Sequence, residues 1–215
     1  MSSPSAKRVP NSLGSAGDSA PARRLEEGGE GPRASAAFLV GYRGSGKTVV
    51  GKLLADELGW ELVDTDALVE HAVGMTIAEY FAQDGEAAFR QCESQALQAV
   101  TARLGAGERL LVSTGGGIIL DPNNVSQMRQ RGVVVWLRAS VDVLERRIGG
   151  DPATLGARPA LQGSSSVSEV GAVLKTRLPL YEAAAHVTIS TDSLTPTQVT
   201  GDALRLILDY TGTGD

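Results

Sequence analysis

The chain has 215 residues, of which 42% are hydrophobic and 21% are charged, and its formal net charge is −5. This length suits one domain of ordinary size with its own core. An acidic body argues against a nucleic-acid surface, so any bound anion must be held by local positive groups. No apolar run approaches the roughly 18 residues that a membrane span needs. We therefore expect a protein that binds neither nucleic acid nor membrane.

The first 33 residues are rich in Ser, Ala, Gly, Pro and Arg and have few large apolar side chains. Such a composition cannot bury enough surface to order itself. The segment lacks the apolar stretch of a secretory signal, and its four acidic residues argue against a transit peptide. We expect residues 1–33 to be a disordered extension, or the product of a misassigned start, before one folded domain over 34–215. The lone Cys92 excludes an intramolecular disulfide and suits a reducing cytoplasm.

A glycine-rich motif opens the folded domain. Residues 41–48 have the spacing G-x-x-x-x-G-K-[ST], after an apolar run over 36–40 and before helical spacing over 47–58. A strand, a glycine loop and a helix are the context of a P-loop, whose backbone N–H groups surround phosphate oxygens. Lys47 would reach the outer phosphates and Thr48 would ligate Mg²⁺. The alternative is a glycine-rich turn that merely fits the pattern. The residues expected to bind ATP here are Gly44, Ser45, Gly46, Lys47, Thr48 and Val49.

Beyond the motif, apolar runs alternate with stretches of helical spacing. This alternation predicts a parallel sheet covered on both faces, with ligands at the carboxyl ends of its strands. Residues 150–166 contain Gly, Pro and Ser clusters and are typical of a long loop, a candidate lid. Strands are predicted over 36–40, 61–64, 109–113, 133–137 and 186–190. Helices are predicted over 47–58, 66–73, 76–82, 84–104, 123–131, 140–148, 166–182 and 196–209.

Two carboxylates follow the second predicted strand, in the sequence Asp64-Thr65-Asp66. Beside a phosphate loop, carboxylates can hold Mg²⁺ through water or accept a proton from a substrate hydroxyl. The alternative is helix capping, because Asp is favoured at N-caps. Two aspartates in this position favour a ligand role over capping alone.

Three glycines, Gly115, Gly116 and Gly117, follow the third predicted strand. Consecutive glycines permit positive φ and the close approach of a ligand to bare backbone. As an isolated motif they could equally form an ordinary turn. Their position at a strand end favours contact with a ligand.

Four arginines complete the candidate site. Arg90 and Arg177 stand in stretches that are otherwise apolar on one side, and an arginine against an apolar wall is a strong fork for a carboxylate. Arg158 lies in the predicted lid and could swing over the transferred phosphate. Arg147 ends a helix, where stacking on a nucleotide base and helix C-capping are both open.

In this order, the motifs resemble those of the shikimate kinases over roughly residues 36–210. The resemblance implies the nucleoside-monophosphate-kinase fold, a P-loop three-layer α/β/α sandwich with a five-stranded parallel sheet and a lid. It also implies a cytoplasmic, monomeric enzyme of aromatic amino-acid biosynthesis that transfers the ATP γ-phosphate to the 3-hydroxyl of shikimate. The matching residues are the P-loop, Asp64-Thr65-Asp66, Gly85-Glu86, Phe89-Arg90, Glu93, Gly115–Gly117, Arg158-Pro159 and Arg177-x-Pro179-Leu180-Tyr181.

The resemblance further implies a role for each matched residue. On the phosphate side, Lys47 and Arg158 contact the transferred group, Arg147 packs on adenine, and Asp64 helps Thr48 to hold Mg²⁺. On the acceptor side, Asp66 contacts the hydroxyls and is the candidate base. The residues implied to bind the rest of shikimate are Arg90, Gly115, Gly116, Gly117 and Arg177, with Phe81 and Phe89 as pocket walls.

The chain departs from the family pattern in three places: the N-terminal segment, the long stretch before Arg158, and Arg43 in the P-loop, which has no evident role. Two other functions stay open. One is a kinase of another small hydroxylated acid, such as gluconate, on the same fold. The other is a nucleotide-binding homologue without activity, against which the intact Lys47, Asp66 and Arg90 argue.

Overall fold

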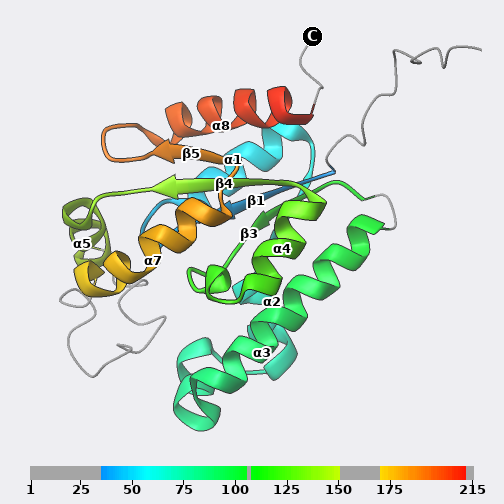
Figure 1. Ribbon diagram of the computed structural model, residues 1–215, viewed down its shortest axis with the longest axis vertical. Coiled ribbons are helices and arrows are strands. Elements are labelled where there is room, and N and C mark those ends of the chain that lie inside the picture. The colour runs from blue at the N-terminus through cyan, green and yellow to red at the C-terminus, as the bar shows by residue number, and fades with distance from the viewer. Residues whose placement is uncertain (1–34, 106–107, 151–169, 212–215) are drawn as a thin grey trace, which may run out of the picture. The chain divides into compact units, whose positions relative to one another are not determined.

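The computed structural model describes residues 35–105, 108–150 and 170–211. The N-terminal extension and most of the predicted lid, including Arg158, lie outside the described residues. Figure 1 shows the arrangement of the elements. The strands are β1 (Ala36–Val40), β2 (Glu61–Asp64), β3 (Leu110–Ser113), β4 (Val133–Arg138) and β5 (Val187–Ser190). The helices are α1 (Lys47–Leu58), α2 (Thr65–Val73), α3 (Ile77–Gly105), the 3-10 turn η1 (Ile118–Leu120), α4 (Pro122–Arg131), α5 (Val141–Gly149), α7 (Val170–Ala184) and α8 (Pro196–Thr211).

The five strands form one parallel sheet in the order β2-β3-β1-β4-β5. The predicted α/β fold with a five-stranded parallel sheet is therefore confirmed, and each predicted strand agrees to within one residue at either end. Short apolar runs separated by stretches of helical spacing predict a parallel sheet, because parallel strands need crossover helices between them.

The sheet is covered on both faces, and its central strands are accordingly apolar and buried, as in β1, where all five residues are buried. Alternate residues of each strand point to opposite faces. Ala37 and Leu39 pack with α1 and α8, whereas Phe38 and Val40 pack with α3, α4, α5 and α7. Figure 1 shows α1 and α8 on one side of the strands and α4 and α7 on the other.

The long helix α3 is broken at Gly85, whose φ of 82° and ψ of 176° are not helical. The two helices predicted over 76–82 and 84–104 are these two parts. A glycine can adopt this conformation without steric cost, so the chain changes direction there. Both parts of α3 pack with α2 around a small separate core of Val69, Ile77 and Phe89.

The strand register brings three connections to one edge of the sheet. Asp64 pairs with Ser113, and Ser113 pairs with Leu39. The P-loop after β1, the aspartates after β2 and the glycines after β3 therefore leave the sheet at the same level. No helix in the described part of the chain is long and apolar enough to cross a membrane.

Candidate active site

The P-loop joins β1 to α1 with left-handed or otherwise positive φ at Gly41, Gly44 and Gly46. A side chain at Gly41 would also collide, because its Cβ would stand 2.6 Å from the Leu137 carbonyl oxygen. The Lys47 ammonium folds back over the loop and donates to the Gly41 oxygen at 2.8 Å and the Tyr42 oxygen at 3.1 Å. The loop thus carries its cation at its own centre, where phosphate oxygens bind in such motifs.

A cavity of about 620 Å³ opens over this loop. The structure brings together in its lining the P-loop residues that the sequence predicts, both aspartates, Gly116 and Arg147. The start of α8 closes one side with Leu194, Pro196 and Val199, which are apolar. A cavity with the charged P-loop on one side and apolar side chains on the other suits a ligand with phosphates at one end and a flat ring at the other.

Arg147, at the end of α5, is held in place at the rim of this cavity. Its guanidinium donates to the Gly44 oxygen at 3.3 Å, to the Thr191 hydroxyl at 3.1 Å and to the Thr191 carbonyl oxygen at 2.7 Å. These contacts join the P-loop to the segment after β5. They leave the flat face of the guanidinium as the surface on which a ring can stack.

Asp64 is the N-cap of α2, as the alternative interpretation predicted. One of its oxygens accepts from the backbone N–H groups of Asp66 at 2.9 Å and Ala67 at 3.3 Å. Asp64 nevertheless lines the cavity, as do Asp66 and Thr48. Capping and a ligand role are compatible, because a carboxylate has a second oxygen.

The donors around this cavity fit a magnesium ion. Hydroxyl and carboxylate oxygens from Thr48, Asp64 and Asp66 are hard ligands of the kind that Mg²⁺ prefers. Among the described residues there is no group of three or more His, Cys, Asp or Glu side chains that could hold a metal alone. Mg²⁺ commonly binds through one or two carboxylates together with phosphates and water, so such a sparse set is what it requires.

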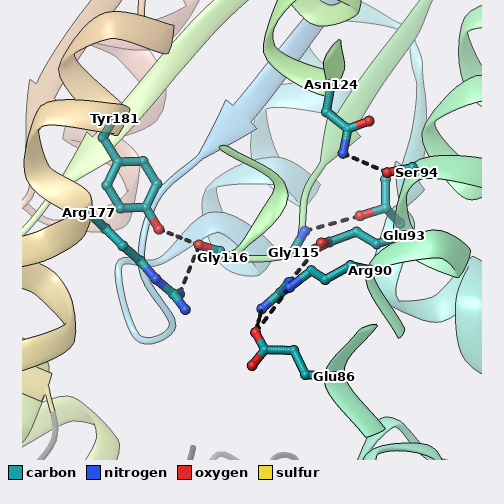
Figure 2. Close-up of polar contacts among 10 residues, drawn as sticks. Glu86, Arg90, Glu93, Ser94, Gly115, Gly116, Asn124, Arg177 and Tyr181 are labelled. Carbon is teal, nitrogen blue, oxygen red and sulfur yellow. Dashed lines mark hydrogen bonds and ion pairs between the residues drawn. The ribbon is translucent and has the colours of Figure 1, made fainter. Parts of the chain in front are cut away.

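Arg90 extends from α3 toward the glycines after β3 (Figure 2). It donates to the carboxylate of Glu93 at 2.7 Å and to that of Glu86 at 2.9 Å. Burial alone would lower the pKa of Arg90, but these two carboxylates hold it above its usual value. The side chain is 22% exposed, so a fixed and permanently charged fork remains open to a ligand.

Gly117 is what allows Arg90 to lie there. A Cβ at Gly117 would stand 2.5 Å from the Arg90 Cζ, inside the guanidinium. Gly116 is also closely packed, since its Cβ would stand 3.3 Å from the Gly41 oxygen. Positive φ was one expected reason for these glycines, and here the prediction was wrong: no positive φ occurs at 115–117 among the described residues. Close packing is the reason, because a guanidinium and the P-loop occupy the space of the missing side chains.

Arg177 and Tyr181, one turn apart on α7, reach Gly116 from the same helix (Figure 2). Arg177 donates to the Gly116 carbonyl oxygen at 3.3 Å and Tyr181 donates to the same oxygen at 2.6 Å. Arg177 also lies over the Tyr42 ring, 6.0 Å from its centroid. Because Gly116 lines the cavity, these contacts connect Arg177 directly to the phosphate site.

Several residues that hold this arrangement were missed as functional residues. The Thr65 hydroxyl accepts from the Gly115 N–H at 3.0 Å, so α2 holds the glycines. Glu86 and Glu93 orient Arg90, and Tyr181 shares an acceptor with Arg177. For Glu86, Glu93 and Tyr181 the available signal was helical spacing, since they stand three or four positions from the arginine they assist.

The predicted pocket walls Phe81 and Phe89 lie together, with ring centroids 4.7 Å apart, and Phe89 is fully buried in the small core of α2 and α3. That core sits under Arg90, whose Cζ is 5.2 Å from the Phe89 centroid. Arg90 therefore stands on an apolar support, as its sequence neighbours indicated.

Comparison with known proteins shows the family to which the chain belongs. The family model described as shikimate kinase matches residues 43–208. Shikimate kinase 2 of Yersinia enterocolitica is 41% identical over 80% of this chain and 95% of its own length. Shikimate kinase of Oleidesulfovibrio alaskensis is 42% identical over 79% of this chain and 95% of its own.

Solved structures agree. A shikimate kinase from Acinetobacter baumannii, in complex with shikimate, superposes with a TM-score of 0.73 at 36% identity, covering 81% of this chain and 93% of its own. A gluconokinase from Sinorhizobium meliloti shares the fold, with a TM-score of 0.52 at 18% identity over 85% of this chain and 99% of its own. The predicted resemblance is thereby confirmed, and the chain belongs to the shikimate kinase family.

Proposed function

We propose that this protein transfers the γ-phosphate of ATP to the 3-hydroxyl of shikimate, as a step of aromatic amino-acid biosynthesis. The observation that carries the proposal is the junction at Gly116. That glycine lines the cavity over the P-loop, and its carbonyl oxygen accepts from Arg177 of the acceptor side. A phosphate site and a carboxylate fork within one backbone contact suit a kinase of a small acid.

The phosphate end of ATP is held by the backbone N–H groups of residues 44–49 and by Lys47. When phosphate enters, the Lys47 ammonium exchanges two carbonyl oxygens for charged phosphate oxygens, which are stronger acceptors. Arg147 stacks on adenine against the apolar start of α8. These groups need no rearrangement of the sheet, since each is fixed by its own element.

Magnesium is held by Thr48 and, through water, by Asp64. When bound, the ion neutralises charge on the phosphates and lowers the barrier to attack on phosphorus. Asp64 suits a role through water, because one of its oxygens already caps α2.

Shikimate is held by its carboxylate between Arg90 and Arg177, with its hydroxyls toward Asp66 and the glycines. Asp66 orients the 3-hydroxyl and receives its proton as the oxygen bonds to phosphorus and the bond to ADP breaks. Holding the acid at its far end leaves the reacting hydroxyl in line with the phosphate. Arg158 belongs to the lid in this proposal, where it contacts the transferred phosphate while water is excluded.

We also propose that the catalytic unit is the domain over 34–215 and that residues 1–33 are dispensable for turnover, which the family match over residues 43–208 supports. We further propose a cytoplasmic monomer that binds neither nucleic acid nor membrane. Removal of residues 1–33 should leave kcat and both KM values unchanged. A large loss of activity on this deletion would contradict the domain boundary.

The direct test is a coupled assay of ADP release with purified protein, ATP, Mg²⁺ and shikimate. We expect turnover with shikimate and none above background with gluconate, the substrate of the rival kinase. Lys47→Ala is the inactive control, because it removes the cation nearest the charge that develops on the transferred phosphate. Absence of turnover with shikimate, or full turnover by folded Lys47→Ala protein, would refute the proposal.

A further inference from the structure

We infer that Tyr181 is a positioning residue of the acceptor site, and that its hydroxyl holds the Gly116–Gly117 peptide in place when Arg177 turns to the acid. The inference rests on the proposed function. Tyr181 is fully buried, and its ring stacks on Trp136 of β4 with centroids 5.5 Å apart and an interplanar angle of 10°. Burial and stacking hold the ring, and they therefore fix the direction of its hydroxyl.

That target is the Gly116 carbonyl oxygen, at 2.6 Å. Arg177 donates to the same oxygen, but at 3.3 Å, which is long for a nitrogen donor. The tyrosine therefore makes the shorter of the two bonds, and the guanidinium is held only loosely at this oxygen. Both donors come from α7 at positions four apart, and Arg177 is only 8% exposed.

The orientation of this peptide matters to the acceptor. In a trans peptide the N–H points opposite to the C=O, so a Gly116 carbonyl directed at Tyr181 turns the Gly117 N–H the other way. Gly117 abuts the Arg90 guanidinium. The bond from Tyr181 thus fixes the direction of the Gly117 N–H, a backbone donor in a residue that abuts Arg90.

That the Gly116 oxygen has two donors, Tyr181 and Arg177, has a separate consequence. A two-pronged grip on a carboxylate draws the Arg177 guanidinium away from a weak acceptor such as a neutral carbonyl. Without Tyr181, this shift would leave the buried Gly116 oxygen with no partner, and a buried carbonyl without a partner is costly. With Tyr181 present, the carbonyl stays bonded and Arg177 is available to the acid.

Tyr181→Phe tests this, since it keeps the ring on Trp136 and removes only the hydroxyl. We expect KM for shikimate to rise by about 5- to 100-fold, the range that follows from leaving a buried acceptor without a partner. KM for ATP should stay within about twofold, because no cavity-lining ATP contact changes. Tyr80→Phe is the matched control: it removes a hydroxyl that contacts the Cys92 sulfur at 3.5 Å on α3, and both KM values should stay unchanged.

A second substrate separates positioning from a loss of packing. Methyl shikimate lacks the charge that draws Arg177 away, so Tyr181→Phe should reduce kcat/KM for the ester much less than for shikimate. An equal reduction for acid and ester, or an unchanged KM for shikimate in a folded variant, would overturn the inference. Failure of the wild-type enzyme to use shikimate would instead refute the proposed function, so the two failures are distinguishable.

Discussion

Asp64 and Asp66 stand two residues apart and do different work. Asp64 gives one oxygen to the N-terminus of α2, and the Oδ1 atom of Asp66 is shielded from solvent beside the cavity. A cap anchors the strand end and leaves only one oxygen for water or metal. Asp66 lines the cavity and does not carry the helix cap, which is why the proposed mechanism gives it the role of base.

If Asp66 is the base of the proposed mechanism, Asp66→Asn should lower kcat by about 10²- to 10⁴-fold, the usual contribution of general base catalysis. Nucleotide affinity should be retained, because Lys47 and the loop backbone are untouched. Asp64→Asn should keep thermal stability, since Asn is as good an N-cap as Asp. Its loss of activity should be partly restored by added Mg²⁺. The measurement is kcat of each variant over a series of Mg²⁺ concentrations. If the two variants respond identically to Mg²⁺, this division of roles is wrong.

Arg90 is a fork whose value depends on its shape as well as its charge. Arg90→Lys keeps the charge and loses the planar pair of donors. We predict a loss of about 1.5–3 kcal/mol in shikimate binding, the cost of one hydrogen bond to a charged group. Titration calorimetry with each ligand measures it. If ATP affinity falls while shikimate affinity is unchanged, Arg90 belongs to the nucleotide site and not to the shikimate site.

At the scale of elements, the segment after β3 has its conformation imposed by its neighbours. Thr65 from α2 holds Gly115, Tyr181 and Arg177 from α7 hold Gly116, and Arg90 from α3 fills the space beside Gly117. Side chains from three helices, α2, α3 and α7, therefore meet on three residues. Substitutions here should act through the arginine they displace rather than through backbone strain.

Gly117→Ala tests this view. Its φ of −105° is open to alanine, so the only obstacle is the Arg90 guanidinium that the Cβ would enter. We predict that KM for shikimate rises at least tenfold while KM for ATP is unchanged. Gly201→Ala on α8 is the control, because its Cβ would meet nothing within 4 Å. It should stabilise the protein by about 0.5–1 kcal/mol, since glycine is a poor helix residue.

At the scale of the molecule, His186 joins three elements. Its side-chain Nδ1 accepts from the Val134 N–H at 3.0 Å, and its backbone N–H donates to the Val134 carbonyl oxygen at 2.8 Å. The centroid of its ring lies 5.0 Å from that of Tyr210 on α8. Burial, with a smaller effect of the nearby Arg129 charge, lowers the pKa of His186 below its ordinary value. Nδ1 can accept this bond only when it is unprotonated.

The folded protein thus binds this proton less readily than the unfolded chain. His186 contributes stability above the unfolded pKa of about 6.5, and this contribution is lost as pH falls below it toward the lowered folded value. We predict that Tm falls more steeply with acidification in the wild type than in His186→Gln. Scanning calorimetry at a series of pH values measures the slopes, with exposed His71→Gln as control. If Tm falls with pH equally steeply in His186→Gln and in the wild type, groups other than His186 cause the acid sensitivity.

The sequence determined the parts that depend on local pattern. Apolar runs of about five residues between helical stretches specify the parallel sheet, and the motif over 41–48 specifies the phosphate loop, because backbone conformation there depends on glycine itself. The P-loop motif made Lys47 a candidate, a strand end beside it made Asp66 one, and apolar neighbours made Arg90 and Arg177 candidates; their roles stay predictions.

Only the tertiary structure decided how these parts meet. Strand order and register, which set Asp64 beside Ser113, depend on contacts between segments about 50 residues apart. The glycines after β3 looked like a site for positive φ, but what they accommodate is a guanidinium from α3 and a loop from β1. Tyr181 was part of a matched motif but was given no role, because its partner is a backbone carbonyl 65 residues away. A pattern in sequence reports what a residue can do, whereas the partner it acts on is chosen by packing across the whole sheet.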